Sequence, residues 1–338
     1  YNKACYYYSM ILDKGDGIEI NKEESKQYLR EGARLGHIES MFKYGLELLD
    51  DPKTGEEPVL YFKKSIEEGH IESMYRYGMM FHSGEGVEQN KKEAAKYLRM
   101  SAYSGNAKSM AFYGFILQHG DGIPIDKEEA VKLFQRGSEL GNDAAMNNYA
   151  YSLHVGNGVP VNKEEAIKYY KMAIEKGNSA AMVNYADMLR IGDQIPTNKE
   201  EAIKFFKKSI EIGNENAMIN YAKMLRYGEG IQVNKEESNK YYKMAIKKGN
   251  QVALKDYIIL LQNDEDAEFD IKEATEILKK AIENGDSDAM NGYGVMLYKG
   301  KGFKTNKEEG LKYIKMAMDK GNINAIMNYA LFLSINKD

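Results

Sequence analysis

Apolar residues recur along this chain in steps of three and four positions, the spacing that places side chains on one face of an α-helix. Between Gly141 and Gly177 this pattern predicts two successive helices. The apolar face of the first is formed by Ala145, Met146, Tyr149, Ala150 and Leu153. That of the second is formed by Ala166, Tyr169, Tyr170, Ala173 and Ile174. No segment shows the two-residue alternation of a half-buried strand, so we expect an all-α protein.

The predicted second helices end at glycines that follow a fixed period. The first interval is 33 residues and the next seven are 36. The glycines are Gly36, Gly69, Gly105, Gly141, Gly177, Gly213, Gly249, Gly285 and Gly321. A period of this length indicates stacked helix pairs, each too small to bury its own apolar face. We expect these glycines to adopt the left-handed conformation that ends many helices.

Two further signals mark the boundaries inside each pair. Gly156-Asn157-Gly158 ends the first helix, and Val159-Pro160-Val161 leads to the second. The segment Asn162-Lys163-Glu164-Glu165 predicts a capping box, in which the Asn side chain accepts an amide proton and Glu165 reaches back. The same box recurs at 21–24, 90–93, 126–129, 198–201, 234–237 and 306–309.

We therefore predict a single domain over residues 1–338, an α/α superhelix that forms a right-handed solenoid of about nine helix-turn-helix repeats. The repeats are expected at 1–36, 37–69, 70–105, 106–141, 142–177, 178–213, 214–249, 250–285 and 286–321, with a partial one at 322–338. Because the chain opens at Tyr1 inside a helical pattern, we expect it to be a fragment of a longer protein.

Two repeats and the last helix depart from the regular pattern. Between Met41 and Gly69 the connecting loop is three residues short, and it carries Pro52 and Pro58. In the second irregular repeat the paired glycines are replaced by Asp264, Glu265 and Asp266. The last predicted helix, 324–334, should expose a face that a further second helix or a partner would cover.

Composition narrows the function classes. Apolar residues make up 43% and charged residues 29%. The net charge is only -4, and acidic and basic residues are interleaved along the chain. This charge pattern argues against nucleic-acid binding, and no apolar run is long enough to span a membrane. The single cysteine, Cys5, favours a reducing compartment. We expect a cytoplasmic protein, with the endoplasmic reticulum lumen as the open alternative.

The repeat resembles that of the Sel1-like family, a relative of the tetratricopeptide repeats. The positions that carry the resemblance in one repeat are Ala217, Ala222, Gly228-Glu229-Gly230-Ile231, Asn234, Tyr241, Ala245 and Gly249. Some members of that family staple each repeat with a cysteine pair, which this chain lacks. The resemblance covers almost the whole chain. It implies an adaptor that binds a protein or an extended peptide and takes no cofactor.

Several features that could suggest chemistry have a better structural interpretation. The paired-glycine loops lack the preceding strand that a dinucleotide site needs, and the glutamate pairs suit capping and the helix dipole. His37 and His70 stand where other repeats have Asn and are interpreted as caps. His82 and His154 lie 72 residues apart, too far to share a metal ion. We therefore predict no catalytic, metal or cofactor residues, no small-molecule substrate and no enzymatic activity.

A methionine stripe admits two interpretations. One position of the repeat holds Met41, Met74, Met110, Met146, Met182, Met218 and Met290. Such a stripe can form an adaptable binding surface. Since Ala and Tyr of the same helix face flank it, we interpret it as core.

Partner-binding residues are expected on the concave face, which first helices line in tandem repeats of this type. One position there holds Asn148, Asn184, Asn220 and Asn328. Carboxamides both donate and accept, so this ladder could hold the backbone of an extended peptide. Beside it lie Tyr151, Asp187 and Lys223, and then His154, Arg190 and Arg226. Arg190, Lys223 and Arg226 would form a cationic spot for an acidic or carboxyl-terminal peptide.

The alternative for the Asn ladder is that it bonds neighbouring helices and orders the stack. If the ladder binds a ligand, replacing Asn184 and Asn220 by Ala should weaken partner binding and leave thermal stability nearly unchanged. Three functions stay open: an interaction scaffold, the regulatory arm of a larger enzyme such as a kinase, and a structural component of a large, for example cytoskeletal, assembly. The first is the expectation that we favour.

Overall fold

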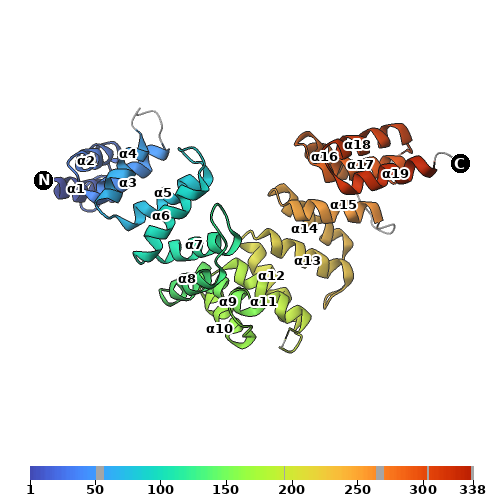
Figure 1. The fold of residues 1–338 in the computed structure, drawn as a ribbon, viewed down its shortest axis with the longest axis horizontal. Coiled ribbons are helices and arrows are strands. Elements are labelled where there is room, and N and C mark those ends of the chain that lie inside the picture. The colour runs from blue at the N-terminus through green and yellow to red at the C-terminus, as the bar shows by residue number, and fades with distance from the viewer. Residues whose placement is uncertain (51–56, 194, 264–269, 303, 336–338) are drawn as a thin grey trace. The chain divides into compact units, whose positions relative to one another are not determined.

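The computed structural model describes residues 1–50, 57–193, 195–263, 270–302 and 304–335 (Figure 1). Nineteen helices occupy these residues, and no strand is found among them. The chain divides into two compact parts, residues 1–181 (unit 1) and 182–338 (unit 2). The prediction of an all-α protein built from helix pairs is confirmed. That these pairs form one continuous domain stays a prediction.

Unit 1 contains five complete helix pairs. The odd-numbered first helices are α1 (Asn2–Lys14), α3 (Ile38–Asp50), α5 (Ile71–Ser83), α7 (Ala107–His119) and α9 (Asp143–Val155). The even-numbered second helices are α2 (Lys22–Arg34), α4 (Pro58–Glu67), α6 (Lys91–Tyr103), α8 (Lys127–Glu139) and α10 (Lys163–Glu175). Pro58 begins α4, where its missing N–H costs nothing. Pro52 lies outside the described residues.

The boundary between the two units falls in the first turn of α11 (Ser179–Ile191). The first helices that follow are α13 (Glu215–Tyr227), α15 (Gln251–Asn263), α17 (Ser287–Lys299) and α19 (Ile323–Ile335). The second helices are α12 (Lys199–Glu211), α14 (Lys235–Lys247), α16 (Ile271–Glu283) and α18 (Lys307–Asp319). Asp264, Glu265 and Asp266 lie outside the described residues. As predicted, α19 exposes an apolar face, which includes Ile323, Met327 and Leu331.

The core forms where the apolar faces of successive helices meet. All five residues predicted for the first helix of the 142–177 repeat are buried, as are Ala166, Tyr170 and Ala173 of the second. Tyr169 and Ile174 are only partly buried. All seven methionines of the stripe are buried, so its interpretation as core is confirmed.

The periodic glycines have a backbone reason. All nine adopt positive φ values between 80° and 101°, as expected for helix ends in the left-handed conformation. The second glycine of the paired-glycine loop has a packing reason as well. A Cβ on Gly158 would lie 2.3 Å from the carbonyl oxygen of Lys127, in the first turn of the preceding second helix. These loops are therefore places where the backbones of neighbouring repeats touch.

The capping boxes form, with a different partner for the glutamate. The amide of Glu165 donates to Asn162 Oδ1 at 3.1 Å, as predicted. The Glu165 carboxylate, however, accepts from the side-chain amide of Asn162 at 2.9 Å. In a standard capping box the glutamate would bind the backbone N–H of the cap. Here the backbone N–H of Asn162 instead donates to Leu153 O of the first helix, also at 2.9 Å.

This arrangement predicts that Asn and Asp are not equivalent caps in this chain. Asn162→Asp keeps the oxygen that accepts from the amide of Glu165. It replaces the NH2 group that donates to the Glu165 carboxylate by a negatively charged oxygen, which that carboxylate repels. We expect a loss of about 0.5–1 kcal/mol in unfolding free energy, since the helix dipole offsets only part of the lost bond and the repulsion. Urea denaturation measures this change.

The matched control is Asp126→Asn, in the box whose natural cap is an aspartate that accepts from the amide of Glu129. The Glu129 carboxylate there accepts from the Tyr103 hydroxyl and pairs with Lys132. This variant gains the donor and should be neutral or more stable. Equal effects of the two substitutions would contradict the proposed role of the side-chain amide.

Candidate functional site

The predicted ligand residues of unit 1 lie on α9. Asn148 Oδ1 accepts from the side-chain amide of its neighbour Asn147 at 3.2 Å. The ring of His154 packs edge-on to Tyr170, with centroids 6.3 Å apart. Tyr151 points away from the core and is 44% exposed. Of these three predicted residues, Tyr151 is therefore the most available to a partner.

The predicted residues of unit 2 are brought together around Asp187. Asn220 Nδ2 donates to Asp187 Oδ2 at 2.8 Å, and Arg190 Nε donates to Asp187 Oδ1 at 3.1 Å. Arg190 also reaches Glu229, at 3.0 Å. Burial raises the pKa of the Asp187 carboxyl, while the Arg190 guanidinium and the Asn220 amide oppose this shift. Asn184 is half-buried on α11.

The other predicted cations also have partners in unit 2. Lys223 Nζ lies 2.9 Å from Asp256 Oδ2. Arg226 is buried and donates to Asn239 Oδ1 at 3.1 Å. The charges of the expected cationic spot are thus partly neutralised by neighbouring acids or directed into the core. A ligand would meet a mixed polar surface, in which the Lys223 side chain is 45% exposed.

Two of the four ladder asparagines link one repeat to the next. Asn220 bonds to Asp187, 33 residues earlier, and Asn328 Nδ2 donates to Asn291 Oδ1 at 3.0 Å, 37 residues earlier. These bonds are what the stack-ordering alternative expects.

One first-helix position stays partly or fully open to solvent in five successive repeats. In unit 1 it holds Phe115, 41% exposed, and Tyr151; in unit 2 it holds Asp187 and Lys223, which are half-buried, and the exposed Ile259. The next residue on this register, Val295, is buried. The residues directly before this position are buried glycine, alanine or isoleucine. Packing therefore requires a small or aliphatic residue beside this position, whereas the position itself varies between aromatic, charged and aliphatic residues. We call these residues the first-helix face of their own unit: Phe115 and Tyr151 in unit 1, and Asp187, Lys223 and Ile259 in unit 2.

The sequence interpretation missed Phe115 and Ile259, although both lie on the 36-residue register of Tyr151 and Lys223. On α7, Phe115 belongs to an aromatic group. Its ring centroid is 4.1 Å from that of His119 and 6.2 Å from that of Phe112. Unit 1 thus offers an aromatic part of the first-helix face, and unit 2 a charged one.

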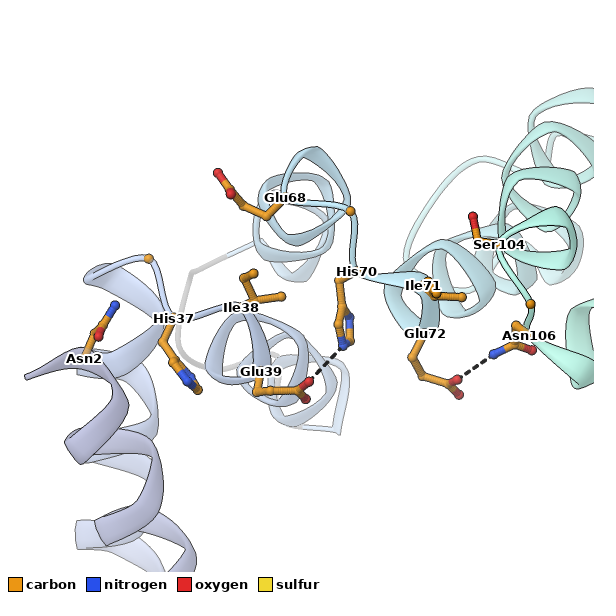
Figure 2. Close-up of a pocket in the computed structure, with 13 residues that line it drawn as sticks. Asn2, His37, Ile38, Glu39, Glu68, His70, Ile71, Glu72, Ser104 and Asn106 are labelled. Carbon is orange, nitrogen blue, oxygen red and sulfur yellow. Dashed lines mark hydrogen bonds and ion pairs between the residues drawn. The ribbon is translucent and has the colours of Figure 1, made fainter.

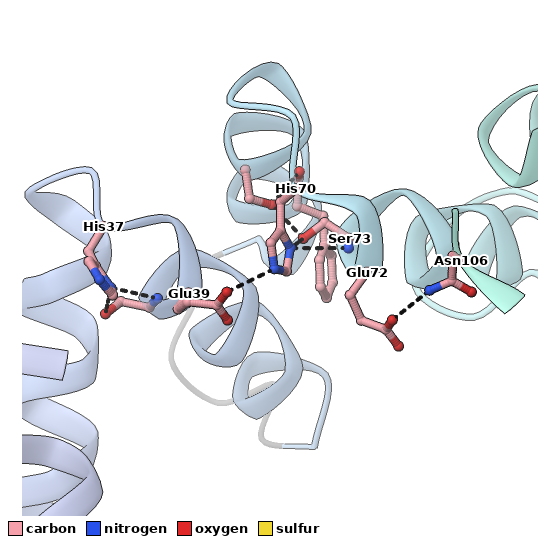
Figure 3. A network of polar contacts seen from close by, with 9 residues as sticks. His37, Glu39, His70, Glu72, Ser73 and Asn106 are labelled. Atoms are coloured by element: carbon pink, nitrogen blue, oxygen red, sulfur yellow. Dashed lines mark hydrogen bonds and ion pairs between the residues drawn. The ribbon is translucent and has the colours of Figure 1, made fainter. Parts of the chain in front are cut away.

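A groove of about 830 Å³ in unit 1 is a second surface that sequence did not predict (Figure 2). It lies where α3, α5 and α7 begin. Figure 3 shows the polar network that lines it, formed by His37, Glu39, His70, Glu72 and Asn106. His70 Nε2 is 3.4 Å from Glu39 Oε1, and Asn106 Nδ2 donates to Glu72 Oε2 at 2.8 Å. Each contact joins one repeat to the next.

The interpretation of His37 and His70 as caps is confirmed. The amide of Ser40 donates to His37 Nδ1 and that of Ser73 donates to His70 Nδ1, both at 3.2 Å. The imidazole thus does the work of Asn106 Oδ1, which accepts from the amide of Ser109. Because these groups already bond to one another, the groove presents few free polar atoms to a ligand.

In the part of the chain that the structure describes, no three His, Cys, Asp or Glu side chains come close enough together to hold a metal ion. His82 Nε2 lies 2.9 Å from Asp121 Oδ2, which also pairs with Lys91. Within the same residues, every helix is too short or too polar to cross a bilayer.

Comparison with known families gives one clear match. A family model described as Sel1 repeat matches seven segments, at 2–37, 71–106, 107–142, 143–178, 179–214, 216–250 and 287–322. The two long unmatched stretches between them hold the repeats that the sequence marks as irregular. A comparison with curated proteins found no match.

Solved structures share the fold at low sequence identity. The protective antigen c5321 of uropathogenic Escherichia coli matches with a TM-score of 0.62 and 20% identity, over 97% of this chain and 79% of that one. A Sel1 repeat protein from Oxalobacter formigenes matches with a TM-score of 0.56 and 22% identity, over 96% and 93%. Yeast Tom70 matches with a TM-score of 0.51 and 15% identity, over 94% and 61%.

The Asn220–Asp187 contact predicts a stability effect. Asn220→Ala removes a donor from a half-buried carboxylate and should lower the unfolding free energy by about 1–2 kcal/mol in urea denaturation. The double variant Asn220→Ala/Asp187→Ala should lose less than the sum of the single losses. Asn216→Ala, at an exposed position of the same helix, is the control and should change little. Unchanged stability in Asn220→Ala would leave this side chain free for a ligand.

The cap formed by His37 predicts a pH effect. Burial lowers the pKa of the His37 imidazole, Glu39 opposes this shift and Lys3 adds to it. The unfolded chain, with an ordinary pKa of about 6.5, therefore takes up a proton at higher pH than the folded chain. Stability should fall as the pH drops from about 7.5 to about 5.5. His37→Asn keeps a cap and should show a weaker fall; parallel curves for the two proteins would contradict this account.

Proposed function

The chain belongs to the Sel1 repeat family, and from this premise we propose that it is an interaction scaffold that binds a protein or an extended peptide along its first-helix face. Proteins with this fold are generally protein-interaction scaffolds. The proposal needs no cofactor and no chemical step, because binding uses only side chains that the stack leaves uncovered.

The observation that carries the proposal is the open first-helix position. Phe115 and Tyr151 are large, rigid side chains that expose apolar area in unit 1. Exposed aromatic residues of this kind are enriched among the residues that dominate interface energies. In unit 2 the same position holds Asp187 and Lys223, which would set charge preference, and Ile259, which would add apolar contact. We propose that the predicted residues Asn148, Asn184, Asn220, Asn328, His154, Arg190 and Arg226 chiefly support this surface.

The exposed apolar face of α19 favours a second candidate, a component held permanently in a larger assembly. Ile323 is 73% exposed and Met327 is 66% exposed. Large apolar side chains that gather on one exposed face mark a surface that contacts another protein. The regulatory-arm alternative rests on the family resemblance alone, and no side chain described above favours it.

The proposal predicts that Phe115→Ala/Tyr151→Ala loses partners without unfolding. Proteins captured from a lysate of the source cells by the wild-type chain should be depleted about tenfold with this variant, since two aromatic contacts are removed. Mass spectrometry measures the capture, and direct titration with the purified partner measures the affinity.

The matched control is Leu140→Ala/Val161→Ala, which removes exposed apolar side chains outside the face. It should retain the partners. A captured set that is the same for both variants, or an empty set for the wild-type chain, would refute binding at the first-helix face.

A further inference from the structure

A second groove of about 830 Å³ lies in unit 2 between two second helices, α14 and α16. Its floor is apolar and is formed by Met244, Ile246, Leu254, Ile277 and Ala281. Leu254 comes from α15 and is buried, whereas Met244 is 37% exposed. The groove therefore leaves a strip of apolar surface open between α14 and α16.

Lysines line the rim of this groove. They are Lys240, Lys243 and Lys247 from α14, and Lys280 from α16. Lys243 pairs with Glu273 across the groove at 2.5 Å. Among the residues that the structure describes, no acid lies within ion-pair distance of the other three lysines. Three positive charges thus stand beside an apolar floor in a chain whose net charge is -4.

The remaining acid on the rim, Asp286, already has a structural role. Its carboxylate accepts from the amide of Ala289 at 2.7 Å and caps α17. It is therefore poorly placed to neutralise the lysines.

Lys247 reverses the charge that this position carries in most other repeats. At the last position of the second helix, six other repeats hold an acid: Glu67, Glu139, Glu175, Glu211, Glu283 and Asp319. The first repeat holds Arg34 there. The stack itself accepts an acid there, so packing does not require a lysine. A lysine at the Lys240 register is common in the repeat, at Lys96, Lys132, Lys168, Lys204 and Lys312. The α14–α16 groove is set apart by Lys247, which adds to this positive charge where most repeats offset it with an acid.

We propose that this groove binds an acidic amphipathic segment of another protein, seated with its apolar side on the floor and its carboxylates toward Lys240, Lys247 and Lys280. Each flanking helix has 13 residues, which corresponds to roughly 20 Å at 1.5 Å per residue. A helical segment of three to four turns matches that length, and helix-in-groove binding uses this combination of an apolar floor and a charged rim. This surface is separate from the first-helix face.

Two other anionic partners fit the groove less well. Nucleic acid would satisfy the lysines through its phosphates but would leave the apolar floor without a complement. An anionic membrane offers both features, but a flat surface does not enter a groove between two helices. A protein segment supplies both features in a suitable shape.

The test uses the full 338-residue chain and a fluorescent peptide of about 14 residues, with Glu and Leu placed so that one helix face is apolar. Anisotropy titration at physiological salt should show saturable binding. Lys247→Glu/Lys280→Glu should weaken it about tenfold, through lost attraction and added repulsion. Met244→Gln should weaken it severalfold, through loss of apolar contact.

Three controls decide the interpretation. Lys204→Glu/Lys208→Glu makes the same charge change on α12 and should alter affinity less than about twofold, since screening is strong beyond about 8 Å. A scrambled peptide without an apolar face should bind weakly. Phe115→Ala/Tyr151→Ala should bind the acidic peptide normally, so that failure of either proposed surface is recognised separately.

The proposal is overturned if the wild-type chain does not bind the peptide, or if the α12 control weakens binding as much as the groove variant. Equal binding of the scrambled peptide would also overturn it, since the floor would then have no role. Binding of anionic lipid vesicles that is abolished by Lys247→Glu/Lys280→Glu, without peptide binding, would assign the surface to a membrane instead. Melting curves of all variants exclude loss of fold as the cause.

Discussion

One backbone hydrogen bond holds most of the helix pairs of this protein closed. The N–H of the residue that caps each second helix donates to a carbonyl near the end of the first helix, as from Asn162 to Leu153 and from Asn234 to Leu225, at 2.9 Å in both pairs. A single residue thus attaches to the first helix through its backbone and starts the second helix with its side chain. Because the backbone N–H of the cap is occupied by this bond, only its side chain can contact the glutamate of the box. That explains why the glutamate carboxylate accepts from the side-chain amide of the Asn.

The residue that caps a first helix links neighbouring helix pairs, as the cap of a second helix links the two helices of one pair. Asn178, which follows Gly177, accepts from the amide of Ala181 and donates to Asp143 of the preceding repeat at 2.8 Å. One carboxamide therefore caps α11 and attaches it to α9, the first helix of the preceding repeat. His70 performs both tasks with its two ring nitrogens. The repeat is thus ordered by short polar links as well as by its buried methionines and tyrosines.

Local rules predicted the parts of this structure that depend on neighbours in sequence. Helix spacing, the terminal glycines, the Asn caps and the buried methionine position all follow from periods of three, four and 36 residues. The partners of Asp187, Arg190 and Arg226 did not follow, because they depend on which side chains of adjacent repeats meet. The α14–α16 groove was equally out of reach, since its apolar floor combines residues from three helices. Phe115 was the exception, because its register alone could have placed it beside Tyr151.

The contact between Gly158 and Lys127 has a consequence for how such proteins diverge. There is no room for a methyl group at Gly158, because the loop of this repeat packs directly on the backbone of the repeat before it, at Lys127. Any larger residue would push this loop away from Lys127 and change how the α9–α10 pair packs on the pair before it. The packing of one repeat on the next can therefore change through a single loop residue, while the exposed side chains of the first helices remain unaltered.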